Sequence, residues 1–162
     1  MVDAAMQEEA AEPSWMYLPI PVEEGVAGAA RVLVGEDDAD MRRLVAAMLR
    51  TEGYRVVEAS DGAEVLEQIE ATITGPPRDR IRAVVADIEM PELTGLDVLA
   101  ALRCAQWQTP IILVTAFGNP DVRAEAEWLG ALTLLEKPFR VDALRGAVHK
   151  ALALPFGPCA VA

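Results

Sequence analysis

The chain has 162 residues, of which 52% are hydrophobic and only 5% aromatic, so it is long enough for one domain whose core is mainly aliphatic. Its net charge of −12 disfavours unaided binding to the phosphate backbone of nucleic acids. Two cysteines, Cys104 and Cys159, form no disulfide framework, and a single histidine, His149, argues against most histidine-ligated metal sites. Because no signal peptide or apolar stretch of membrane-spanning length is present, we expect a cytoplasmic protein that does not enter a membrane.

Residues 1–30 are predicted to form a flexible acidic tail. They contain six acidic residues, no lysine or arginine, and several prolines and glycines. The apolar stretch Trp15–Val22 within them either docks on the domain or on a partner, or belongs to a disordered tail, and the sequence leaves both open. Residues 155–162 are predicted to be a C-terminal tail. The domain is therefore expected to span residues 31–154, which are only mildly acidic.

Within residues 31–154, short apolar runs typical of buried parallel strands alternate with segments that have the apolar spacing of amphipathic helices. The expected elements, in chain order, are strand Val32–Val34, helix Asp38–Thr51, strand Tyr54–Ala59, a helix opened by Asp61 and Gly62, the loop Thr72–Arg80, strand Ile81–Ala86, helix Leu96–Cys104, strand Ile111–Val114, helix Asn119–Leu129, strand Leu132–Leu135 and helix Val141–Leu154. Five strands alternating with five helices predict an α/β fold, with a parallel sheet covered on both faces.

Some apolar and polar positions on these elements have purely structural interpretations. Leu44 in the first helix and Val141 in the last are expected to face the core, because they continue the apolar spacing. Asp38 and Asp61 are expected to cap the helices that follow them. His149 is expected to face solvent on the last helix, with no chemical role.

Polar and charged residues follow four of the predicted strands at the point where each strand ends. Glu36 and Asp37 follow the first strand, Asp87 the third, Thr115 the fourth and Lys137 the fifth. Because the carboxyl ends of parallel strands form the crevice in which such folds bind ligands, we expect these side chains to converge.

The expected set of side chains favours phosphoryl chemistry. Clustered carboxylates repel one another, and a hard divalent cation relieves that repulsion. Oxygen ligands without histidine or cysteine indicate Mg²⁺ or Mn²⁺ rather than zinc. A carboxylate beside such an ion can accept a phosphoryl group, while Lys137 neutralises the transferring oxygens and Thr115 donates its hydroxyl to one of them.

The chain resembles the receiver domain of bacterial two-component response regulators, and the resemblance spans residues 31–154. The combination of motifs in register is specific, whereas each alone would be weak. The matching segments are Val32–Asp38 (VLVGEDD), Val84–Gly95 (VVADIEMPELTG), Val114–Ala116 (VTA) and Leu135–Phe139 (LEKPF).

The resemblance implies a flavodoxin-like, doubly wound fold with strand order 2-1-3-4-5. It also implies that Asp87 takes a phosphoryl group from a phosphohistidine of a sensor histidine kinase or phosphotransfer protein. Asp37 and Asp87 would bind Mg²⁺ directly, the backbone carbonyl of Glu89 would complete the protein ligands, and Glu36 would act through a metal-bound water. Thr115 and Lys137 would contact the phosphoryl group, and the Lys137–Pro138 peptide bond would be cis.

In this reading the protein is a stand-alone signalling domain, not an enzyme beyond its own phosphotransfer and autophosphatase chemistry. It would act by contact with a downstream protein, since only eight residues follow Leu154 and no output domain fits there. A homodimer through the fourth helix, fifth strand and fifth helix is one arrangement that the resemblance allows.

The sequence departs from the family at two positions. Leu134 stands three residues before Lys137, where the family usually has the aromatic residue that transmits phosphorylation. Either the coupling is weaker or another side chain replaces it, with Phe117 and Trp128 nearest in sequence. Glu36 stands where aspartate is commoner, and its longer side chain should still reach a metal-bound water.

Two other functions remain open from the sequence. Leu134 also suits a receiver-like interaction domain that is silent to phosphorylation. A small phosphatase with an aspartate nucleophile is a third reading, although such enzymes normally have a second aspartate two residues after the nucleophile, where this chain has Glu89.

Overall fold

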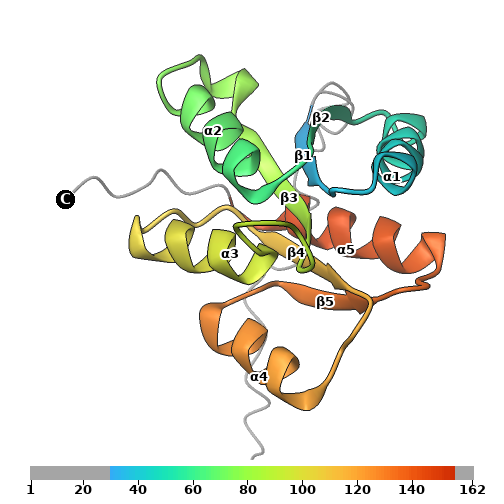
Figure 1. Ribbon diagram of the computed structural model, residues 1–162. Helices are drawn as coiled ribbons and strands as arrows, with labels where there is room; N and C mark the ends of the chain where they lie inside the picture. Colours follow the sequence, from blue (N-terminus) through green and yellow to red (C-terminus); the bar gives the residue numbers. More distant parts are fainter. Residues whose placement is uncertain (1–29, 156–162) are drawn as a thin grey trace, which may run out of the picture.

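Five strands and five α-helices alternate along the chain in the computed structural model, which describes residues 30–155 (Figure 1). The predicted tails, including Trp15–Val22 and Cys159, lie outside these residues except for Ala30 and Pro155. The elements are β1 (Arg31–Gly35), α1 (Ala39–Thr51), β2 (Arg55–Ala59), α2 (Gly62–Ile73), β3 (Ile81–Asp87), α3 (Gly95–Cys104), β4 (Ile111–Thr115), α4 (Pro120–Leu129), β5 (Thr133–Glu136) and α5 (Val141–Ala153).

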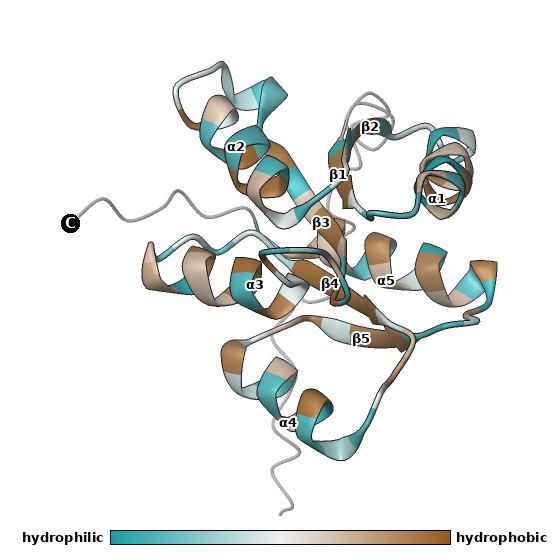
Figure 2. Cartoon of the chain, viewed as in Figure 1, coloured by the Kyte–Doolittle hydropathy of each residue, from teal (hydrophilic) through white to brown (hydrophobic). Residues whose placement is uncertain are grey.

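All strands are parallel and form one sheet in the order β2-β1-β3-β4-β5, which confirms the predicted fold. Helices α2, α3 and α4 pack on one face, around buried residues such as Leu33, Val84 and Leu113. Helices α1 and α5 pack on the other face, around Val34 and Ile112. Figure 2 shows the apolar colour concentrated on the central strands between these two helical layers. The near-continuous apolar runs of β3 and β4 follow from burial on both faces.

The expected boundaries differ from the observed ones by one or two residues, within the usual variation at element ends. Two expected core positions were wrong. Leu44 is 57% exposed and Val141 is 48% exposed. Helix α1 instead buries Val45, Ala46 and Leu49, so its inward face is narrower than the apolar spacing suggested. Val141 is the first residue of α5 and precedes the first buried residue of that helix by almost one turn.

Local hydrogen bonds at the helix starts explain how the chain turns after three of the strands. The Asp38 side chain accepts a hydrogen bond from the Met41 amide, and the Asp61 side chain accepts one from the Glu64 amide, which confirms both predicted caps. Asn119 caps α4 in the same way. The predicted loop after α2 contains a short 3-10 helix, Pro77–Asp79. Among the described residues, no helix has the length and apolar character needed to span a membrane.

A pair of glycine substitutions tests the close packing beneath the end of β3. A Cβ atom on Gly95 would lie 2.6 Å from the carbonyl oxygen of Asp87, whereas a Cβ atom on Gly146 would have no neighbour within 4 Å. We therefore expect Gly95→Ala to lower the free energy of unfolding by about 1–3 kcal/mol, as overpacking does. Gly146→Ala, within α5, should raise it by roughly 0.5–1 kcal/mol. Urea unfolding of both variants provides the comparison, and equal effects of the same sign would contradict this packing.

Candidate functional site

The register of the strands places the predicted site residues at one edge of the sheet. Gly35, the last residue of β1, pairs with Ala86, so Glu36 comes level with Asp87. Asp87 ends β3 and pairs with Val114, the residue before Thr115. Thr115 in turn pairs with Glu136, the residue before Lys137. The amide of Lys137 donates to the carbonyl oxygen of Thr115 at 2.8 Å. The four strand ends therefore converge, as the sequence predicts.

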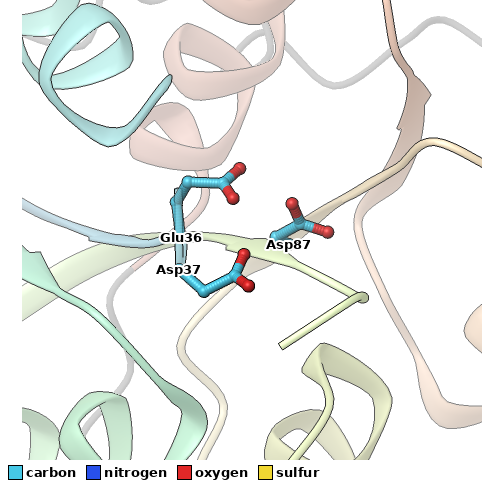
Figure 3. A group of neighbouring side chains, drawn as sticks. All are labelled: Glu36, Asp37 and Asp87. Carbon is cyan, nitrogen blue, oxygen red and sulfur yellow. The ribbon is translucent and has the colours of Figure 1, made fainter. Parts of the chain in front are cut away.

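Three carboxylates meet at the centre of this edge. Carboxylate oxygens of Glu36, Asp37 and Asp87 all lie within 4.8 Å of one another, and Figure 3 shows the three groups pointing into a common space. Asp87 and Glu36 are buried, with 3% and 5% of their surface exposed, whereas Asp37 is exposed. The solvent-facing side of the cluster is therefore the side of Asp37.

Lys137 forms ion pairs with two carboxylates of this cluster. Its Nζ atom donates to Glu36 Oε2 at 2.8 Å and forms a second ion pair with Asp87 Oδ2. Burial alone would lower the pKa of the Lys137 ammonium, but the hydrogen bonds and charges of Asp87 and Glu36 outweigh burial and raise it. Lys137 therefore stays protonated. One positive charge faces three carboxylates, so the group remains negative overall. The Lys137–Pro138 peptide bond is cis.

The environment of Asp87 disfavours ionisation of its carboxyl group. Burial raises its pKa, and the side chain of Glu36 raises it further. Hydrogen bonds with Glu89 and Lys137 act in the opposite direction without cancelling the rise. Because folding raises this pKa, the contribution of Asp87 to stability is fully present below the unfolded value of 3.8 and is lost as the pH rises through the raised value. Ionisation of Asp87 therefore disfavours the folded domain.

The Thr115 hydroxyl has a partner that the sequence did not reveal. Thr115 is fully buried, and its Oγ1 atom donates a hydrogen bond to a carboxylate oxygen of Glu89. The other oxygen of Glu89 accepts from the Ala116 amide at 3.2 Å, and the Phe117 amide donates to Thr115 Oγ1 at 3.0 Å. The only sign of this contact in the sequence is that an acidic residue, Glu89, stands two positions after Asp87. The role of the Glu89 backbone carbonyl as a metal ligand stays a prediction.

The rings of Phe117 and Trp128, the candidate replacements for the family's aromatic residue at the position of Leu134, are not buried at the site. Phe117 is 74% exposed and Trp128 is 85% exposed, so neither packs in the interior beside Thr115. Leu134 is half-buried and packs against the core between the sheet and α2, α3 and α4. His149 and Cys104 are exposed on their helices, as expected for residues without a role in the site.

The oxygen donors at the strand ends fit a hard divalent cation. Three carboxylates with one ammonium partner carry excess negative charge, which a doubly charged ion would neutralise. In this cluster all the donors are oxygen atoms, and such a set suits Mg²⁺ or Mn²⁺ rather than zinc. Glu36, Asp37 and Asp87 are thus able to hold one ion together.

Stability measured without divalent cations tests this charge imbalance. In EDTA at neutral pH we expect Asp87→Asn to raise the midpoint of thermal unfolding by a few degrees, because it removes a buried carboxylate whose ionisation is unfavourable. Lys137→Met should lower the midpoint, because the carboxylates then lose their cation. Glu125→Gln, an exposed position on α4, is the control for a unit change of charge and should have little effect. A lower midpoint for Asp87→Asn would contradict the account.

Comparison with known proteins places the fold and site in a family. Residues 32–149 match the model of the response regulator receiver domain. The chain is 30% identical over 124 residues to sporulation initiation phosphotransferase F of Bacillus subtilis, which covers 76% of this chain and 94% of that protein. It is 36% identical to transcriptional regulatory protein PdtaR of Mycobacterium tuberculosis, over 76% of this chain and 57% of that protein.

Solved structures agree with the sequence matches. Chemotaxis protein CheY4 of Vibrio cholerae superimposes with a TM-score of 0.67 at 30% identity, covering 76% of this chain and 98% of that chain. A response regulator receiver domain protein of Clostridium thermocellum gives a TM-score of 0.69 at 27% identity, covering 76% and 94%. The family match, residues 32–149, includes Glu36, Asp37 and Asp87, and the chain belongs to the response regulator receiver domain family.

Proposed function

We propose that this protein is a signalling receiver that accepts a phosphoryl group on Asp87 from a phosphohistidine of a sensor histidine kinase or phosphotransfer protein, with Mg²⁺ as the required ion. The observation that carries the proposal is the position of the Asp87 carboxylate. It lies at the end of β3, within 4.8 Å of the carboxylates of Glu36 and Asp37, and it is paired with the ammonium group of Lys137. A carboxylate between an ion site and a fixed cation is suited to attack phosphorus.

Transfer of the phosphoryl group needs only Asp87 and the donor phosphohistidine as reacting groups. A carboxylate oxygen of Asp87 forms a bond to phosphorus while the bond between phosphorus and the donor imidazole nitrogen breaks, and the released imidazole takes up a proton. Attack of water on the acyl phosphate later returns the Asp87 carboxylate and releases inorganic phosphate. A bound Mg²⁺ would neutralise charge on the phosphoryl oxygens.

Residues of this chain would hold the ion and the phosphoryl group. Asp37 and Asp87 bind the ion directly in this proposal, with Glu36 acting through a water and the Glu89 carbonyl as a further ligand. Lys137 already contacts Asp87, so its ammonium group can pair with a phosphoryl oxygen without a change of position. Thr115 is the hydroxyl donor at the neighbouring strand end.

Phosphorylation would be communicated through altered contacts with other proteins. The similarity to relatives supports this mode. It covers 94% of the length of a relative named as a phosphotransferase, but only 57% of a relative named as a transcriptional regulatory protein. The net charge of −12 disfavours direct contact with nucleic acid. Thr115 pairs with Glu136 of β5, and Glu136 forms an ion pair with Arg123 of α4. A downstream protein or a second copy of this chain would bind there, over α4, β5 and α5.

Labelling with acetyl phosphate tests the proposed acceptor. We expect wild-type protein in Mg²⁺ to gain one phosphoryl group, located on Asp87 by mass spectrometry of peptides trapped at low temperature. Asp87→Asn should gain none, because the acceptor oxygen is lost, and EDTA should abolish labelling of the wild type. Lys137→Met should slow labelling by at least tenfold, in the range of a lost charge-stabilising contact.

Glu125→Gln, at an exposed position on α4, is the control for a unit change of charge. Its labelling should match that of the wild type. A folded wild-type protein that is never labelled, by acetyl phosphate or by kinases, would favour the phosphorylation-silent interaction domain. Labelling that persists in Asp87→Asn would place the acceptor elsewhere.

A further inference from the structure

The side chain of Glu89 occupies the hydrogen-bond donors next to the acceptor aspartate. One carboxylate oxygen accepts the hydroxyl of Thr115, and the other accepts the Ala116 amide at 3.2 Å. The residue lies two positions after Asp87, and its own amide donates to Asp87 Oδ1 at 2.8 Å. Glu89 therefore links the loop after β3 to the end of β4, directly beside the carboxylate cluster.

These contacts are the kind that an incoming anion would need. A carboxylate and a phosphoryl group are both anionic and accept hydrogen bonds through oxygen atoms, so they compete for the same donors. Thr115 has one hydroxyl hydrogen, which Glu89 uses. The Thr115 oxygen is also fixed from the other side, since it accepts from the Phe117 amide at 3.0 Å. The hydroxyl therefore cannot serve Glu89 and a phosphoryl oxygen at once.

Glu89 also adds a fourth carboxylate to an edge that is already negative. The three clustered carboxylates and Glu89 lie at the edge where the ammonium group of Lys137 pairs with Glu36 and Asp87. An approaching phosphoryl group would meet this charge in addition to the occupied donors, and like charges at short range in a partly buried site repel one another. Glu89 itself is exposed, so its side chain has room to swing into solvent when it is displaced.

We propose that the Glu89 carboxylate is an internal competitor of the phosphoryl group, which holds Thr115 and Ala116 until it is displaced. In this role Glu89 is a positioning residue that sets how readily Asp87 is occupied. The inference rests on the proposed function and deepens it: the threshold for phosphorylation is set partly by a side chain of the receiver itself. Removing the carboxylate should release the two donors and strengthen the binding of phosphoryl analogues.

Beryllofluoride, an analogue of the phosphoryl group, provides the test. Its affinity is measured by calorimetry on the full chain at saturating Mg²⁺, with the Mg²⁺ affinity of each variant determined separately. Glu89→Ala should bind beryllofluoride about tenfold more tightly than the wild type, the size of effect expected for one hydrogen bond to a charged group. Glu89→Gln should lie between them, because its amide oxygen still accepts from Thr115 but carries no charge. Glu67→Gln, at an exposed position on α2, should match the wild type.

A second background separates competition for the donors from simple removal of charge. In Thr115→Val protein the hydroxyl is absent, so Glu89→Ala should strengthen beryllofluoride binding by clearly less than it does in the wild type. The same tenfold gain in both backgrounds would contradict competition for the hydroxyl.

Hydrogen exchange of the protein without ligand reports the resting contact directly. The Ala116 amide should exchange faster in Glu89→Ala than in the wild type, because it loses the carboxylate acceptor. The inference is overturned if Glu89→Ala binds beryllofluoride no more tightly than the wild type. In that case the wild type still binds beryllofluoride, and the proposed function stands. Failure of the proposed function would instead appear as no binding by the wild type or by any variant.

Discussion

Three carboxylates held within 4.8 Å of one another, with one ammonium group between two of them, are the interaction on which the rest of the site depends. The protein backbone imposes this arrangement, because the register of β1 and β3 brings Glu36 level with Asp87. The folded domain therefore carries an unfavourable concentration of negative charge. That charge suits the site to a divalent cation, while burial, followed by the side chain of Glu36, raises the pKa of Asp87. The proposed function and the local instability therefore have the same physical origin.

The loop between β4 and α4 connects this charged edge to the surface. Thr115 and Ala116 contact Glu89 at the site, and further along the loop Gly118 packs closely against the side chain of Glu136. Glu136 in turn pairs with Arg123 on α4. The hydrogen bond between Thr115 and Glu89 therefore lies close along the chain to the polar contacts between α4 and β5.

The fold and the convergence at the strand ends were predictable from the sequence. Fully buried strands such as β4 are continuously apolar, and the polar residue that follows each strand marks the edge of the sheet. The exposure of Leu44 was not predictable, because periodicity gives the direction of an apolar face and not its width. The contact between Glu89 and Thr115 joins side chains 26 residues apart, and its geometry depends on how the loops after β3 and β4 approach each other. Sequence spacing carries no information on that approach.

Calorimetric titration with Mg²⁺ tests the central claim most directly, because it needs neither a kinase nor a phosphoryl donor. The full chain is expected to bind one Mg²⁺ in a saturable manner, and a variant carrying both Asp37→Asn and Asp87→Asn is expected to lose this binding. Glu125→Gln, which changes the charge away from the cluster, should bind as the wild type does. Wild-type protein without saturable binding, or a double variant with unchanged affinity, would contradict the claim that these carboxylates form a cation site.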